Sequence, residues 1–166
     1  MATIVIPFRP NGKERLASAG PGLAQAMLVD VLAACEPIAR TVIAGGENGQ
    51  GPAVQEALVG LEGPVAIVNA DLPCAQPEDV RRLLAETPLF GLALVEAADG
   101  TTNALAVSSP DVFQPLYGPG SAERFRAAAP SRTLTIENLA DDVDTPDDLA
   151  RLNGRLGPST REALAP

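Results

Sequence analysis

Short runs of apolar residues alternate along this chain with stretches in which apolar residues recur every three or four positions. The short runs are typical of strands buried inside a sheet, and the periodic stretches are typical of helices that cover it. The pattern predicts strands at 3–6, 41–44, 65–68, 89–95, 103–107 and 133–136. It predicts helices at 23–32, at 52–61, from 77 onward, at 122–128 and at 146–155.

The order of these elements predicts one α/β domain. Strands and helices alternate up to Leu84, which favours parallel crossovers and a mostly parallel, doubly wound sheet. The strands that follow Gly100 are less regularly interleaved with helices, so an antiparallel piece is expected near one edge. The chain of 166 residues has room for a single core. The domain is expected to span 1–156, with 157–166 as a loosely ordered C-terminal tail.

The run Val65–Val68 is the expected central strand, and Asp71 follows it closely. Pro73 cannot continue a central strand, so Asp71 lies just past the carboxyl end. Ligands bind at this edge of open α/β sheets. A carboxylate there would repel a phosphate unless a divalent cation lay between them, so we hypothesise that Asp71 holds Mg²⁺ for a nucleotide. The alternative is a turn-forming Asp ahead of Leu-Pro.

A second pair of carboxylates, Asp142 and Asp144, precedes the last expected helix. In extended backbone both project from one face while Val143 faces the other way. Together with Asp71 they would make a cluster of three carboxylates, the oxygen ligands that Mg²⁺ prefers. The alternative is an acidic helix start that complements the helix dipole, as Asp147 and Asp148 do.

Cations gather directly after the first expected strand. Arg9, Lys13 and Arg15 lie in a loop on the same sheet edge as Asp71, where they could bind a triphosphate and stabilise a leaving pyrophosphate. A solvated loop is the alternative.

Four glycine- or hydroxyl-rich stretches could contact ligands as well. Gly45-Gly46 and Gly49–Pro52 permit close approach to a planar base, or are flexible turns. Thr101–Asn103 and Gly118–Ser121 could hold an anion with backbone amides and a hydroxyl, although Ser121 also suits a helix N-cap.

Composition narrows the function classes. The net charge of −9 argues against binding a nucleic-acid backbone. The chain has no His, the usual general base and zinc ligand. Cys35 and Cys74 show no paired spacing, so we expect a reducing cytoplasm in which both thiols are buried or inert. No signal peptide or membrane-spanning segment is expected.

Five stretches in the same order resemble one family. IPFRPNGKERL, NADLP, DGTTNAL, YGPGSAERF and DVDTPDDL are similar to the 2-phospho-L-lactate/phosphoenolpyruvate guanylyltransferases of coenzyme F-420 biosynthesis. The resemblance implies a nucleotide-diphospho-sugar-transferase-like fold and Mg²⁺-dependent transfer of GMP from GTP to a phosphorylated three-carbon acid, with release of pyrophosphate. The next enzyme of the pathway is a possible partner.

The resemblance also implies residue roles. Metal ligands fall on Asp71, Asp142 and Asp144, and the acceptor pocket falls on Thr102, Asn103, Gly118 and Ser121. Nucleotide-binding positions are Pro7, Arg9, Lys13, Arg15, Gly46, Gln50, Gly51 and Asp71. Of these, Lys13, Arg15 and Asp71 would be catalytic.

The chain departs from the family pattern in two places. A βα segment between Ala44 and Gly51 is expected to be missing, and Arg9 stands where a lysine is common. Two alternatives therefore stay open: a non-catalytic nucleotide- or metabolite-binding protein, or a nucleotidyltransferase acting on a sugar phosphate, a pterin or 3-phosphoglycerate.

Overall fold

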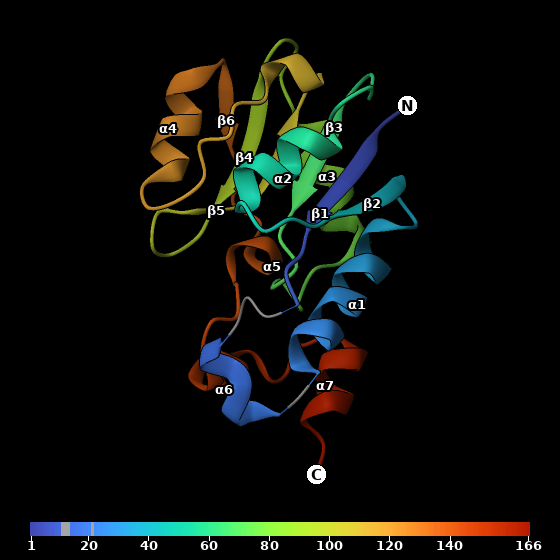
Figure 1. Cartoon of the computed structure of the whole chain (residues 1–166), viewed down its shortest axis with the longest axis vertical. Helices are drawn as coiled ribbons and strands as arrows, with labels where there is room; N and C mark the ends of the chain where they lie inside the picture. Colours follow the sequence, from blue (N-terminus) through green and yellow to red (C-terminus); the bar gives the residue numbers. More distant parts are fainter. Residues whose placement is uncertain (11–13, 21) are drawn as a thin grey trace.

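The computed structural model describes residues 1–10, 14–20 and 22–166. Within them, six strands form one sheet in the order β2-β1-β3-β5-β4-β6 (Figure 1). The strands are β1 (Thr3–Pro7), β2 (Arg40–Ala44), β3 (Val65–Val68), β4 (Leu92–Glu96), β5 (Thr102–Val107) and β6 (Ser131–Thr133).

Helices connect these strands and form layers on both faces of the sheet. The α-helices are α1 (Leu23–Cys35), α2 (Gln50–Ala57), α3 (Pro77–Ala85), α4 (Ser121–Ala128), α5 (Glu137–Ala140), α6 (Pro146–Leu152) and α7 (Pro158–Leu164). Two 3₁₀ helices, η1 (Glu14–Ala19) and η2 (Pro110–Val112), complete the described elements. The predicted doubly wound α/β domain is confirmed.

The antiparallel element lies inside the sheet, and this corrects the expectation of an antiparallel edge. β1 pairs in parallel with β2 and β3, and β4 pairs in parallel with β6. Among the described strands, β5 alone runs against its neighbours, β3 and β4. Only residues 97–101 connect β4 to β5, which is long enough for a hairpin but too short for a parallel crossover.

Two apolar layers hold the sheet between the helices. Ile4 and Ile6 of β1 pack with α1, α3 and α5 on one face, and Val5 packs with α2 and α4 on the other. This alternation follows from the twofold period of a strand, and it explains why the central strands are apolar without interruption.

A third cluster extends the molecule beyond the carboxyl end of the sheet. It gathers η1, α6 and the start of α1 around Met27, Val143 and Leu152. Residues 157–166 were expected to form a loosely ordered tail, but the structure has α7 there, lying beside α1 (Figure 1). The domain boundary at 156 stays a prediction.

Two strand predictions were wrong at their ends. The apolar run from Leu89 predicted a strand over 89–95, but β4 begins at Leu92, and Leu89 and Phe90 are each 84% exposed. The ladder starts only where Leu92 donates to the Pro130 carbonyl. The last strand was expected at 133–136, but Ile136 already caps α5.

Both cysteines are buried and free, as expected. In the described part of the chain, no helix has the length and apolar character needed to cross a membrane.

Candidate active site

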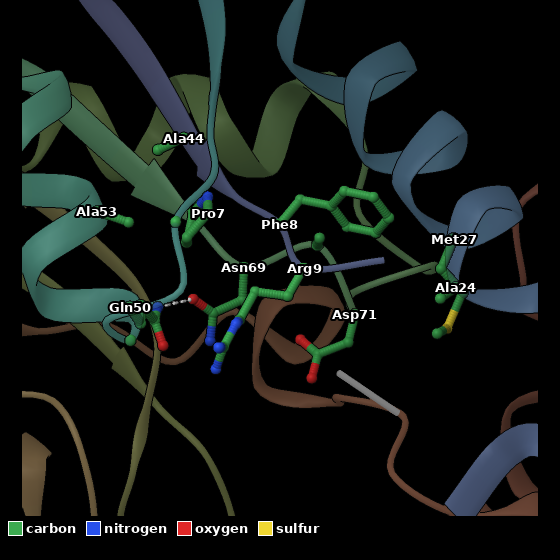
Figure 2. Close-up of a pocket in the computed structure, with 13 residues that line it drawn as sticks. Pro7, Phe8, Arg9, Ala24, Met27, Ala44, Gln50, Ala53, Asn69 and Asp71 are labelled. Atoms are coloured by element: carbon green, nitrogen blue, oxygen red, sulfur yellow. Dashed lines mark hydrogen bonds between the residues drawn. The ribbon is translucent and has the colours of Figure 1, made fainter. Parts of the chain in front are cut away.

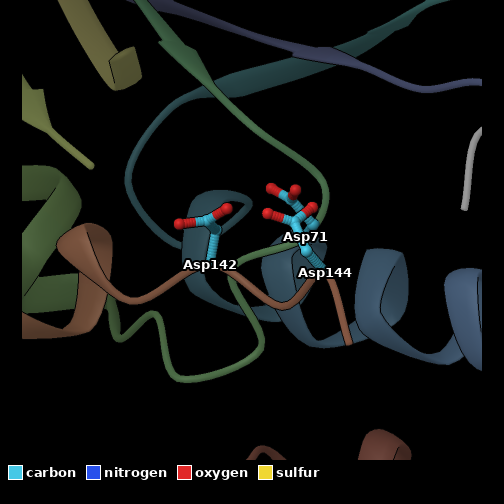
Figure 3. A group of neighbouring side chains, drawn as sticks. All are labelled: Asp71, Asp142 and Asp144. Atoms are coloured by element: carbon cyan, nitrogen blue, oxygen red, sulfur yellow. The ribbon is translucent and has the colours of Figure 1, made fainter. Parts of the chain in front are cut away.

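Three carboxylates from distant parts of the chain meet at the carboxyl edge of the sheet. Asp71 follows β3, and Asp142 and Asp144 lie between α5 and α6 (Figure 3). Each offers one oxygen, and these three oxygens lie within 4.8 Å of one another. All three residues are half-buried. The cluster predicted from sequence is therefore present, and its oxygens are close enough to share one cation.

Backbone hydrogen bonds fix this meeting point. Val143 donates its amide to the Asp71 carbonyl over 3.0 Å, which ties the two segments together. The Val143 side chain is fully buried in the third cluster, so its neighbours on either side face the opposite way, as predicted. The Asp148 carboxylate accepts from the amides of Asp144 and Thr145 over 2.9 and 3.0 Å. Asp148 therefore holds the backbone and leaves Asp144 in the cluster.

The carboxylates of the cluster repel one another when ionised. Burial, a hydrogen bond with Asp144 and the charge of Asp71 raise the pKa of Asp142 to about 7. Asn103 counters part of this effect by donating to Asp142 Oδ1 over 3.2 Å, and it also donates to the Ala140 carbonyl over 3.0 Å. A divalent cation would neutralise the repulsion, which is the behaviour expected of a metal site.

A pocket of about 260 Å³ opens beside Asp71 (Figure 2). Its walls come from the carboxyl ends of β1, β2 and β3 and from the starts of α1 and α2. They are formed by Pro7, Phe8, Arg9, Ala24, Met27, Ala44, Gly46, Gly49, Gln50, Ala53, Asn69, Ala70 and Asp71. Arg9 donates to the Glu47 carbonyl over 2.9 Å. Apolar walls with a few polar groups suit a flat heterocycle.

A second pocket, of about 230 Å³, lies on the other side of Asp71 and also contains Asp142 and Asp144. Thr102, Asn103, Gly118 and Ser121 all line it. The Thr102 and Ser121 hydroxyls are buried and 3.0 Å apart. Tyr117 joins this lining too, and its buried hydroxyl has no hydrogen-bond partner among the described residues.

Gln50, Asn69 and Asp71 line both pockets and so stand between them. Sequence reasoning missed Asn69, although it lies two positions before Asp71 at the end of the same strand. The argument that selected Asp71 from the strand end applies equally to Asn69. Asp99, in the turn between β4 and β5, was not singled out as a site residue either and lines the second pocket.

The structure describes only some of the other predicted nucleotide-binding residues. Lys13 lies outside the described residues, and the side chain of Arg15 is likewise not described. Pro7, Arg9 and Gly46 line the first pocket. Gly51 is buried at the start of α2, where a Cβ would stand 3.0 Å from the Pro115 side chain. The roles assigned to these residues stay predictions.

Comparison with known proteins shows the family of this chain. A protein named phosphoenolpyruvate guanylyltransferase from Streptomyces scabiei is 32% identical over 98% of this chain and 95% of its own length. The chain belongs to the phosphoenolpyruvate/2-phospho-L-lactate guanylyltransferase family. A phosphoenolpyruvate guanylyltransferase from Sphaerobacter thermophilus is 40% identical, over 58% of this chain and 51% of its own length. No family model matches the chain.

Solved structures of low identity share the fold of this chain. A protein from Desulfovibrio desulfuricans G20 described as a nucleotide-diphospho-sugar transferase superposes with a TM-score of 0.70 at 19% identity, covering 91% of this chain and 85% of that one. Rv0371c of Mycobacterium tuberculosis H37Rv, solved in complex with manganese, gives a TM-score of 0.59 at 20% identity, covering 91% and 96%. The predicted fold type is confirmed.

This family member is shorter than its relative across the aligned region. The alignment with the Streptomyces scabiei protein spans 206 positions, and this chain has 166 residues, so at least 206 − 166 = 40 positions are gaps on its side. In the structure only residues 45–49 separate the edge strand β2 from α2. That one missing segment lies between Ala44 and Gly51 stays a prediction.

Proposed function

We propose that this protein transfers GMP from GTP to a small phosphorylated three-carbon acid, phosphoenolpyruvate or 2-phospho-L-lactate, and releases pyrophosphate. One observation carries the proposal: the cluster of Asp71, Asp142 and Asp144 lines the second pocket, and its Asp71 also lines the first, so a nucleotide and a small acid in the two pockets would meet at one cation. The names of the relatives support the same reaction. Its place would be in coenzyme F-420 biosynthesis, as the motifs imply.

The chemistry needs no protein nucleophile. The acceptor phosphate is anionic at neutral pH, and one of its oxygens forms a bond to the α-phosphorus of GTP. The bond from that phosphorus to the bridging oxygen breaks, and its electron pair leaves with pyrophosphate. Catalysis then consists of positioning and charge stabilisation, which a chain without His can supply.

The site residues divide this work between them. The first pocket would take the base and ribose, and Arg9 would face the phosphates. In the second pocket, the hydroxyls of Thr102 and Ser121 would orient the acceptor. Asp71, Asp142 and Asp144 would hold Mg²⁺, which when bound neutralises phosphate oxygens. Lys13 and Arg15 would offset the charge of the leaving pyrophosphate.

The direct test is release of pyrophosphate. The folded protein would be incubated with GTP, Mg²⁺ and, in separate reactions, phosphoenolpyruvate, 2-phospho-L-lactate and 3-phosphoglycerate. We expect pyrophosphate to form with at least one of the first two, together with the corresponding guanylylated acid. No product with any acid from a protein that binds GTP would reject the transferase in favour of a non-catalytic binding protein.

A further inference from the structure

A chain of side-chain hydrogen bonds connects the two pockets through Asn69. Asn69 Nδ2 donates to the backbone carbonyl of Thr102 over 3.2 Å. Asn69 Oδ1 accepts from Gln50 Nε2 over 2.7 Å (Figure 2). The Asn69 backbone amide also donates to the Asn103 carbonyl over 3.1 Å, which fixes the position of Asn69 relative to β5.

The chemistry of these groups sets the direction of every bond in the chain. A backbone carbonyl can only accept, so the nitrogen of the Asn69 amide must face Thr102. The oxygen of Asn69 must then face Gln50, and Gln50 must turn its own nitrogen toward Asn69. If the Gln50 amide were reversed, its oxygen would face the Asn69 oxygen, and no hydrogen bond could form between them. The orientation of Gln50 is therefore decided by a carbonyl with which it has no direct contact.

This orientation leaves the Gln50 carbonyl oxygen as the group presented to a ligand. In Figure 2 the oxygen points away from Asn69, and it accepts no hydrogen bond from a described residue. Gln50 lines the first pocket together with Gly49 and Ala53, and it also lines the second pocket. An acceptor fixed at this place discriminates between bases by whether they present a donor to it.

We propose that Gln50 recognises the 2-amino group of guanine, and that Asn69 is the positioning residue that keeps the Gln50 oxygen turned toward it. This inference rests on the proposed function for the identity of the base. Guanine carries an amino donor at position 2, hypoxanthine carries only a hydrogen there, and xanthine carries an oxygen acceptor. The fixed carbonyl therefore favours GTP over ITP and disfavours XTP most.

The first part of the test removes the carbonyl oxygen of Gln50, which is the proposed hydrogen-bond acceptor. Dissociation constants for GTP, ITP and XTP would be measured by calorimetry without any acceptor acid. In Gln50→Met, we expect GTP to bind about tenfold more weakly while ITP binding changes little, because the lost hydrogen bond concerns only the 2-amino group. Gln55→Met is the matched control, since Gln55 is exposed on the same helix and should leave all three constants unchanged.

The second part of the test removes the hydrogen bond that orients the Gln50 side-chain amide. In Asn69→Leu nothing fixes the Gln50 amide, so it can turn its nitrogen toward a xanthine oxygen. We expect the preference for GTP over XTP to fall about tenfold. A merely structural role for Asn69 would instead weaken GTP and XTP together. If Asn69→Leu does not fold, the comparison of GTP with ITP in Gln50→Met decides alone.

The outcomes separate this inference from the proposed function. Unchanged nucleotide ratios in both variants, or equal binding of GTP and ITP by the native protein, overturn the role of Gln50 even if pyrophosphate is formed. If the variants change the ratios of the dissociation constants but no pyrophosphate is formed, the proposed transferase activity is overturned. The role of Gln50 in recognising guanine then still holds. A native protein that binds no purine nucleotide overturns both.

Discussion

Asp71, Asp142 and Asp144 are brought together against their mutual repulsion by groups that have no part in the chemistry. The segment between α5 and α6 is held in place by the burial of Val143 and by the hydrogen bonds that Asp148 accepts from two backbone amides. Burial, the hydrogen bond with Asp144 and the charge of Asp71 together raise the pKa of Asp142. Proteins accept such local conflicts chiefly where a ligand relieves them.

The first prediction concerns Asp71. We expect Asp71→Asn to lower kcat by about a hundredfold or more, because a neutral amide binds a divalent cation far more weakly than a carboxylate. The melting temperature of the cation-free protein should be unchanged or higher, since one repelling charge is gone. Pyrophosphate release and thermal unfolding measure the two effects.

Asp147→Asn is the control for this experiment. Asp147 is an exposed acid in the first turn of α6, outside both pockets, so its loss should leave kcat unchanged. Full activity in Asp71→Asn would remove Asp71 from the metal site.

At the scale of elements, α7 is attached to α1 by one buried carboxylate. Asp30 of α1 accepts from the backbone amides of Ser159 and Thr160 over 3.0 and 2.8 Å, and from the Thr160 hydroxyl over 2.6 Å. Gly157 permits this approach, because a Cβ there would overlap the Asp30 carboxylate. A helix too short to be stable alone is thus held by specific hydrogen bonds and the third apolar cluster.

The second prediction follows from this contact. Asp30→Ala leaves buried donors of α7 without acceptors, and we expect the free energy of unfolding to fall by about 2–3 kcal/mol. Hydrogen exchange should show residues 158–164 losing protection before the sheet does. Asp30→Asn keeps one hydrogen-bond acceptor, so its free energy of unfolding should fall less. Equal protection in the native protein and Asp30→Ala would show that apolar packing alone holds α7.

The third prediction concerns pH and the pairing of α5 with α6. Burial opposes ionisation of Asp141, but hydrogen bonds from Arg155 and Arg151 outweigh it and lower the pKa of this carboxyl below 3.8. A lowered folded-state pKa contributes stability above the unfolded pKa, and this stability is lost as the pH falls through the folded pKa.

Asp141→Asn should therefore destabilise the protein by about 1 kcal/mol near pH 7, the scale of a partly exposed ion pair. The difference from the native protein should shrink as the pH falls below 3.8 and through the lowered pKa of Asp141. Urea unfolding at pH 7 and across this acid range measures it. A constant difference across this range would assign the effect to packing.

At the scale of the whole molecule, a cation bound at the cluster would connect the sheet to the segment between α5 and α6. The fourth prediction is that Mg²⁺ or Mn²⁺ raises the melting temperature of the native protein. At about a hundred times Kd, the gain is about 2.7 kcal/mol, or roughly 5–10 °C. Asp71→Asn should show little of this rise, and an equal rise in that variant would place the cation elsewhere.

The sequence by itself determined the strands of this fold, most of its described helices and the identity of its acidic cluster. Uninterrupted apolar runs and helical periodicity are local signals, and they predicted every described strand within a few residues. Asp71, Asp142 and Asp144 were found because strand ends and extended backbone have fixed geometries that can be read from residue order.

Tertiary structure alone decided where β5 inserts, how α7 docks and which way Gln50 points. The place of β5 depends on pairing with both β3 and β4. The docking of α7 depends on a carboxylate about 130 positions earlier in the chain. The orientation of Gln50 depends on the Thr102 carbonyl, reached through Asn69. Each is a contact between distant segments, and the residues that make it carry no local signal of their partner.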